Sequence, residues 1–185
     1  MEEKLVNKDI KEVLLSHEEI LTITKKLGSL ISADYKNSSK PILLGLLKGC
    51  VPFMSYLMNY LTFPLEIEFM DVSSYGNDIK SSGDVKIKKD IDVSVFNRDV
   101  IICEDIVDTG QTLNTVIRLL HHRGARSVEV VTLLDKPDGR ITPFKPKYIG
   151  YVIPKVFVVG FGLDYQQYYR NLPYIGILKE SIYKK

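Results

Sequence analysis

Val100-Ile101-Ile102-Cys103-Glu104-Asp105-Ile106-Val107-Asp108-Thr109-Gly110-Gln111-Thr112-Leu113 joins an apolar run to a carboxylate-rich loop and then to a helix. The apolar residues lead directly into two acids, and a third acid precedes Thr-Gly-Gln-Thr. In open α/β sheets, ligands bind at the carboxyl ends of strands, and a helix N-terminus offers backbone N–H groups to a phosphate. The stretch therefore predicts a buried strand over 99–104, a ligand-binding loop, and a helix over 112–123.

Strand-like and helical segments alternate along the rest of the chain. A capping box at Ser16–Glu19 opens a helix predicted over 17–36. Apolar patterning predicts further strands at 41–47, 65–72, 85–91, 128–134, 148–153 and 156–159, and another helix from about Phe53 to Leu61. This alternation favours an α/β fold with a mainly parallel central sheet flanked by helices. Residues 65–91 are expected to form a long flexible hairpin beside that sheet.

The composition is that of an ordinary globular chain. Its 185 residues are 45% hydrophobic and 26% charged, which suits one domain with a substantial core. The net charge of +2 is too small to argue for nucleic acid or an anionic membrane as a partner, and no apolar stretch reaches the length of a membrane span. Cys50 and Cys103 lie in or beside apolar segments and are expected to be buried reduced thiols. We therefore expect a cytoplasmic protein with no nucleic-acid or membrane partner.

Two glycine-containing stretches match known motifs only in part. Gly160-x-Gly162 is followed by no helical pattern, which argues against a dinucleotide site. Gly45 to Gly49 lacks the Gly-Lys-Ser/Thr ending of a P-loop. The chemistry is therefore expected to depend on the acids and threonines of 104–112.

Residues 101–112, with the order acid–acid–x–x–acid–Thr-Gly-x-Thr, resemble the phosphoribosyl-diphosphate-binding motif of the type I phosphoribosyltransferases. The form of the motif is typical of the purine-salvage branch. Further stretches resemble, in order, the diphosphate loop at 46–49, the catalytic lid at 73–76, and the base-binding hood at 134–137 and 157–165. The resemblance covers about residues 40–175 and is strongest to the bacterial hypoxanthine (6-oxopurine) members of the family.

This resemblance implies the type I phosphoribosyltransferase fold, with residues 1–185 as a single domain. A small hood would be formed by the N-terminal segment and about residues 136–185. The implied reaction is the Mg²⁺-dependent transfer of phosphoribosyl from 5-phosphoribosyl 1-diphosphate to hypoxanthine or guanine. The products would be IMP or GMP and diphosphate. The family usually forms homodimers or homotetramers, so a homo-oligomer is expected here.

The displacement at C1 needs a cradle for the 5′-phosphate, and residues 108–112 are suited to form it. Backbone N–H groups at the helix start and the hydroxyls of Thr109 and Thr112 can satisfy phosphate oxygens. Gly110 lets the backbone approach closely, and Gln111 occupies a variable position of the motif. The alternative is a plain capped turn, which would not require three acids before it.

The diphosphate and the ribose need charged partners. By resemblance, Glu104 and Asp105 hold the ribose hydroxyls and a metal-bound water, and Lys48 and Arg170 supply positive charge to the diphosphate. Gly49 belongs to the same diphosphate loop. A solvated lysine at a strand end is the ordinary alternative for Lys48. In the family the peptide before this lysine can be cis.

The purine needs a reading surface, which the resemblance places in the hood. Phe157 would stack on the base, the Val158 backbone would read its edge, and Lys136 would donate to the 6-oxo group. Asp164 is counted among the purine-binding residues too, and it would bind a second Mg²⁺ with the diphosphate completing the shell. A buried strand aromatic is the alternative for Phe157, and the two interpretations are compatible.

Three residues are expected to act during the reaction itself. Asp108 is predicted to accept the purine N7 proton as general base, with simple helix capping as the alternative. Ser74 and Tyr75 would close over the reacting centre and exclude water.

Other functions remain open at this level. The main alternative is a regulatory protein on the same fold that binds phosphoribosyl diphosphate or RNA and makes little nucleotide. The low net charge argues against RNA binding, and the complete purine-reading set argues against a regulator. A relative specific for adenine or a pyrimidine is disfavoured by Lys136.

Overall fold

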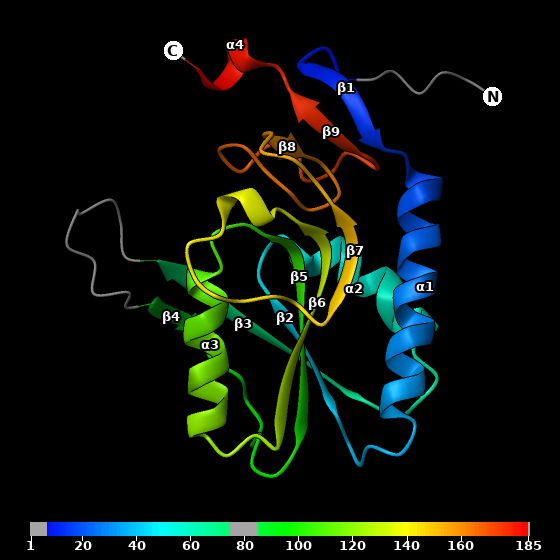
Figure 1. Ribbon diagram of the computed structural model, residues 1–185, viewed down its shortest axis with the longest axis vertical. Helices are drawn as coiled ribbons and strands as arrows, with labels where there is room; N and C mark the ends of the chain where they lie inside the picture. Colours follow the sequence, from blue (N-terminus) through cyan, green and yellow to red (C-terminus); the bar gives the residue numbers. More distant parts are fainter. Residues whose placement is uncertain (1–6, 75–84, 185) are drawn as a thin grey trace.

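The computed structural model describes residues 7–74 and 85–184 and contains a six-stranded sheet, a separate three-stranded sheet, and helices against the larger sheet (Figure 1). The elements, in chain order, are β1 Ile10–Leu15, α1 His17–Tyr35, β2 Ile42–Leu46, α2 Cys50–Leu57, β3 Glu66–Ser74, β4 Val85–Lys89, β5 Asp99–Val107, α3 Gln111–His122, β6 Ser127–Asp135, β7 Tyr148–Val152, β8 Val158–Val159, β9 Ile175–Leu178 and α4 Glu180–Tyr183. Short 3-10 turns occupy Met58–Tyr60 and Pro137–Gly139.

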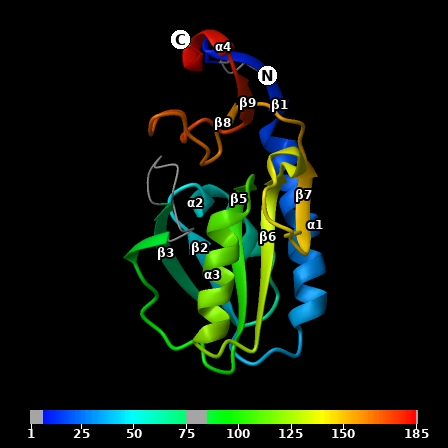
Figure 2. The same ribbon diagram turned by 60° about the vertical axis from the view of Figure 1, so that its left-hand side comes forward.

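The larger sheet has the strand order β4-β3-β2-β5-β6-β7 and is parallel except for β4. β5 lies between β2 and β6, and its first five residues are buried, as expected of a central parallel strand. Helices α1 and α2 pack on one face and α3 packs on the other (Figure 2). The predicted α/β fold with a mainly parallel sheet is therefore confirmed.

The alternation of side chains along β5 divides the core into two layers. Ile101 and Cys103 pack with residues of α1 and α2, whereas Val100 and Ile102 pack with residues of α3. Because α3 follows β5 after only three residues, its N-terminus lies at the carboxyl edge of the sheet. The motif that the sequence singled out is thus held by buried structure on both sides.

The acids at the end of β5 belong to the strand and not to a loop. The sequence predicted a strand over 99–104, but β5 continues to Val107 because its pairing with β6 extends through Ile106↔Leu134 and Val107↔Asp135. Glu104 and Asp105 therefore lie in a part of β5 that is paired with β6, whereas the pairing with β2 ends at Cys103. Their positions are more rigid than a loop assignment implied.

The smaller sheet, called the hood sheet here, consists of β1, β9 and β8 in antiparallel order. It lies beyond the carboxyl ends of the main parallel strands (Figures 1 and 2). The apolar pattern predicted neither β1 nor β9, since each is short and its partner is distant in the chain. The hood was expected to include all of residues 136–185. That expectation is wrong for β7, which pairs in parallel with β6 and so forms the edge of the main sheet.

The expected hairpin is present as the antiparallel pair β3 and β4. Residues 75–84, which join these strands and include Tyr75, lie outside the described residues. The predicted helix over 17–36 is α1, and its capping box is formed by Ser16 and Glu19 as expected. No helix among the described residues is long and apolar enough to cross a membrane.

Candidate active site

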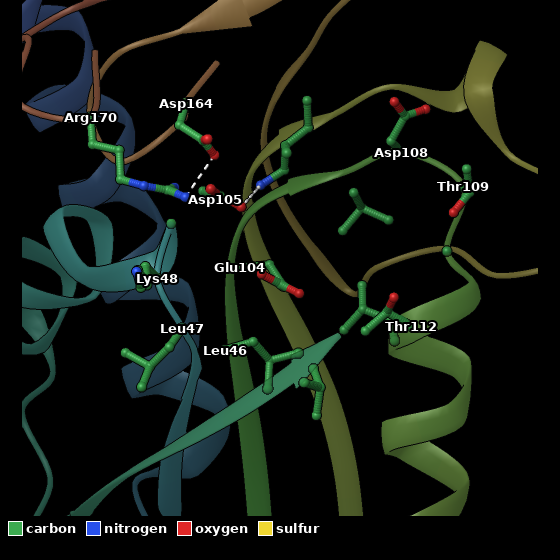
Figure 3. A pocket seen from close by; sticks show the side chains of 16 residues that line it. Leu46, Leu47, Lys48, Glu104, Asp105, Asp108, Thr109, Thr112, Asp164 and Arg170 are labelled. Carbon is green, nitrogen blue, oxygen red and sulfur yellow. Dashed lines mark hydrogen bonds and ion pairs between the residues drawn. The ribbon is translucent and has the colours of Figure 1, made fainter. Parts of the chain in front are cut away.

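A cavity of about 340 Å³ opens at the carboxyl edge of the sheet, between α3 and the hood sheet (Figure 3). Its walls come from the end of β2, the end of β5, the start of α3 and the loop between β8 and β9. Ten of the residues predicted for the site line it, namely Lys48, Gly49, Glu104, Asp105, Asp108, Thr109, Gly110, Thr112, Asp164 and Arg170. Gln111 is exposed at the start of α3 and is not among the lining residues, which agrees with a variable motif position.

Glu104 and Asp105 are half-buried acids next to each other in β5. Burial, together with the charge of Asp105, raises the pKa of Glu104 well above its ordinary value. Burial also raises the pKa of Asp105 to about 6, although the Ile106 N–H at 2.7 Å and the charge of Arg170 act in the opposite direction. The surrounding protein therefore stabilises the charged forms of these two acids only in part.

The start of α3 has the geometry of an anion cradle. Gly110 precedes the helix with φ +79°, a left-handed conformation that glycine adopts without strain, and it has no side chain to cap the helix. The hydroxyl of Thr109 accepts from the Gln111 N–H at 3.4 Å. A Cβ at this position would lie 2.6 Å from the Thr142 hydroxyl and 3.1 Å from Cδ of Arg140. The first backbone N–H groups of α3 and the hydroxyls of Thr109 and Thr112 therefore border the cavity, where they can bind a phosphate.

The loop after β2 brings a cation to the opposite side of the cavity. The Leu47–Lys48 peptide is cis, and the Lys48 side chain is exposed. A Cβ on Gly49 would lie 1.7 Å from Oδ2 of Asp105, so only glycine permits this approach of the loop to β5. Cys50, which follows, is buried, and its pKa is raised to about 12, so its thiol is not a nucleophile.

Asp164 and Arg170 face the cavity from the loop of the hood (Figure 3). An Nη2 atom of Arg170 lies 2.7 Å from Oδ1 of Asp164, and Nη1 donates to the Gly162 carbonyl at 2.7 Å. The Nε atom of Arg170 is buried and has no hydrogen-bond partner among the described residues. This pair places one negative and one positive charge next to Asp105.

A second cavity, of about 240 Å³, adjoins the first. Its walls include the four predicted purine-binding residues Lys136, Phe157, Val158 and Asp164, together with Val156 and Leu163. Asp105, Ile106, Asp108 and Asp164 line both cavities. The apolar cavity under the hood and the polar cavity at α3 therefore meet at these four residues.

Asp108 forms an ion pair with Lys136 at the junction of the cavities. Nζ of Lys136 lies 2.6 Å from Oδ2 of Asp108, and the Lys136 side chain is 15% exposed against 42% for Asp108. A Cβ on Gly139 would lie 1.7 Å from Oδ1 of Asp108, so the 3-10 turn after β6 approaches this carboxylate directly. The two residues that the sequence assigned to different roles are thus in contact.

The lid residues are only partly described. Ser74 is the last residue of β3, and Tyr75 lies outside the described residues. Their predicted roles in closing the site stay predictions.

Arg140 is a residue that the sequence analysis missed. Its guanidinium pairs with Asp135, and Nη1 donates to the Phe144 carbonyl at 2.8 Å. Next to it, the Ile141 N–H donates to the Thr109 carbonyl at 3.1 Å. The segment after β6 therefore holds the loop between β5 and α3 in place. No local pattern in the sequence reveals this contact.

The acids fit the divalent cation that the resemblance implies. Within residues 7–74 and 85–184, no three His, Cys, Asp or Glu side chains form a metal-binding group. Mg²⁺ is usually held by one or two carboxylates, with waters and substrate oxygens as its other ligands. Burial raises the pKa of both Glu104 and Asp105, and a cation bound beside them would favour their charged forms. The donor set therefore suits Mg²⁺ bound together with a substrate.

Comparisons with known proteins agree with this geometry. The family described as "Phosphoribosyl transferase domain" matches residues 11–166. The hypoxanthine-guanine phosphoribosyltransferase of Lactococcus lactis subsp. lactis (strain IL1403) is 51% identical over 185 residues, covering 100% of both chains. The hypoxanthine-guanine phosphoribosyltransferase of Bacillus subtilis (strain 168) is 49% identical over 180 residues, covering 97% of this chain and 99% of the relative.

The similarity to solved structures also covers nearly the whole chain. A crystal structure of a hypoxanthine phosphoribosyltransferase from Staphylococcus aureus has a TM-score of 0.92 and 48% identity, covering 96% of each chain. The similarity therefore includes the sheet, its helices and the hood, and not the motifs alone.

Proposed function

The chain belongs to the phosphoribosyl transferase family, and from that premise we propose that it is a purine-salvage enzyme acting on hypoxanthine or guanine. It transfers the phosphoribosyl group of 5-phosphoribosyl 1-diphosphate to the base, giving IMP or GMP and diphosphate. The predicted family resemblance is confirmed by the match over residues 11–166. The names of the full-length relatives support the choice of 6-oxopurine substrates.

One observation carries this proposal: a polar cavity and an apolar cavity adjoin, and the same three aspartates line both. The polar cavity suits an anionic sugar diphosphate, and the apolar cavity with Phe157 and Lys136 suits a flat base. Because Asp105, Asp108 and Asp164 line both, a donor and an acceptor would meet beside these carboxylates. Proximity of two bound reactants is itself a large part of catalysis.

The sugar diphosphate binds by charge and by backbone dipoles. The 5′-phosphate accepts from the N–H groups at the start of α3 and from Thr109 and Thr112. Lys48 and Arg170 stabilise the negative charge that grows on the leaving diphosphate. Glu104 and Asp105 accept from the ribose hydroxyls, which orients C1 toward the base cavity.

Asp108 and Lys136 exchange their ion pair for contacts with the base. Lys136 donates to the 6-oxo group, and Asp108 accepts the proton from the purine N7 as the bond from C1 forms. Phe157 stacks on the ring, and the Val158 backbone reads its edge. An adenine would meet the Lys136 ammonium with an amino group, so 6-oxopurines are favoured.

Glu104, Asp105 and Asp164 would hold Mg²⁺ through carboxylate oxygens and water. When bound, the cation neutralises charge on the diphosphate. Asp164 would have to share its pairing with Arg170, which at 2.7 Å occupies one of its oxygens.

The test is formation of IMP from hypoxanthine and 5-phosphoribosyl 1-diphosphate, followed by absorbance. We expect activity with hypoxanthine and guanine, little with adenine, and loss of activity when EDTA removes Mg²⁺. The regulatory alternative predicts RNA binding without nucleotide formation, and that result would overturn the proposal. No observation in the structure favours this alternative.

Assembly and location are further proposals. Exposed apolar side chains on α1 and β7, namely Leu30, Tyr151 and Val152, support a homodimer or homotetramer. Sedimentation of the purified protein measures this, and a monomer at micromolar concentration would contradict it. The free, buried thiols of Cys50 and Cys103 are in keeping with a cytoplasmic protein.

A further inference from the structure

Phe157, on the wall of the apolar cavity, is held by two other aromatic rings. The ring of Tyr183 is stacked on it, with centroids 4.8 Å apart and an interplanar angle of 23°. Tyr165 meets it edge-on, at 5.7 Å and 87°. Tyr183 belongs to α4, the short helix at the C-terminal end of the chain (Figure 1).

Tyr183 stacks on one face of Phe157, and the residues of the cavity wall indicate that the other face is turned to the cavity. Among the described residues that line the cavity, Phe157 is included and none comes from α4. A planar ring has two faces, so Tyr183 covers one and the other remains for a bound base. Offset stacking of aromatic rings is favourable on both faces of one ring.

The C-terminal segment also fixes the backbone of Phe157. The Leu178 N–H donates to the Phe157 carbonyl at 2.9 Å, directly before α4 begins. Ile182 and Tyr183 then pack against the small apolar cluster of the hood sheet that includes Val159 and Leu178. The helix is therefore docked on the hood, and its tyrosine is held against Phe157.

We propose that Tyr183 is a positioning residue for the purine base, because its ring holds Phe157 in the orientation that stacks on the base. A half-buried phenylalanine without this neighbour has more freedom to change its rotamer, and ordering it would oppose binding of the base. The inference rests on the proposed function. It adds a residue from the extreme C-terminus to the determinants of base affinity.

The experiment compares Tyr183→Ala and Tyr183→Phe with the unaltered enzyme by initial rates. Loss of the ring is expected to raise KM for hypoxanthine by about two- to tenfold, the range that corresponds to one aromatic pair. KM for 5-phosphoribosyl 1-diphosphate should change less than about twofold, since the polar cavity has no contact with α4. Tyr183→Phe keeps the ring and should restore KM for the base.

Tyr168→Ala is a matched control, because Tyr168 is another hood tyrosine but is 71% exposed. It should leave both KM values unchanged. The inference is wrong if Tyr183→Ala leaves KM for hypoxanthine unchanged or raises both KM values equally. It is also wrong if Tyr183→Ala lowers KM for hypoxanthine, because the Tyr183 ring would then compete with the base for Phe157. If the unaltered enzyme makes no IMP, the proposed function itself has failed, and the two failures are thus distinguished.

Discussion

Asp108 stands at the junction of the two cavities, where a single carboxylate contacts Lys136 and lines both of them. Asp108→Asn keeps the size of the side chain and removes the proton acceptor. We expect kcat to fall by about 10²- to 10⁴-fold while 5-phosphoribosyl 1-diphosphate still binds, which equilibrium dialysis can measure. If Asp108 only capped α3, the amide would preserve most of the activity.

At this scale the residues predicted for the site lie together at the two cavities, but their packing partners were not predicted. Fourteen residues were predicted to bind phosphoribosyl diphosphate, the purine or the metal. Ten of them line the polar cavity, and Lys136, Phe157 and Val158 line the apolar one. Arg140 was missed because its role depends on Asp135 and on carbonyls that the fold brings to it. Motifs record which groups a reaction needs, whereas the groups that hold them in place depend on tertiary packing.

Helix α3 shows how one element is adapted differently at its two ends. Gly110 before the helix and Gly124 after it both have left-handed φ, +79° and +82°. Replacement of either by alanine strains the backbone, at a cost of about 1–2 kcal/mol. Only Gly110 borders the phosphate cradle, so Gly110→Ala should also raise KM for 5-phosphoribosyl 1-diphosphate by at least about tenfold.

Gly124→Ala is the matched control for that prediction. Its Cβ would lie 2.6 Å from Cδ2 of Phe96, an exposed side chain that can move. Thermal unfolding should show a similar loss of stability in both variants, and steady-state kinetics should show a changed KM only for Gly110→Ala. Equal KM values would contradict the assignment of the phosphate to this end of α3.

Elements were predictable where their signal is local. The capped amphipathic α1 and the apolar strands β2 and β6 follow from periodicity, and no end of these elements differs from its predicted position by more than one residue. The strands β1 and β9 were not predictable, because β1 pairs with β9 at register Ile10↔Leu178, across almost the whole chain. Such non-local pairs leave little trace in either segment alone.

The hood sheet and the main sheet share a continuous core, which bears on how the whole molecule unfolds. Leu15 of β1, Val158 of β8 and Ile175 of β9 belong to the same buried cluster as Leu43 and Ile101 of the main sheet. We propose that the chain is a single domain, so calorimetry should show one transition with equal calorimetric and van't Hoff enthalpies. Two separable transitions would show that the hood unfolds independently.

A network at the opposite end of the sheet from the site links stability to pH. Asp99 accepts from Arg126 and from the Ser127 hydroxyl at 2.7 Å, and the pKa of its carboxyl is held well below the ordinary value by the Arg126 guanidinium. A carboxyl whose pKa is lowered by folding stabilises the native state fully above the unfolded value of about 3.9, and this contribution is lost as the pH falls through the folded value.

Asp99→Asn should therefore cost about 2 kcal/mol of unfolding free energy at pH 7, measured by urea titration. The difference from the unaltered protein should narrow as the pH is lowered below about 4, since Asp99 then binds a proton in the unfolded wild-type chain while the native carboxyl, with its lowered pKa, stays ionised. Asp92→Asn is the control, because the Asp92 side chain is 84% exposed and its substitution should have little effect at any pH. A difference that stayed constant down to pH 2 would mean that Asp99 stabilises the sheet by hydrogen bonding independent of its charge.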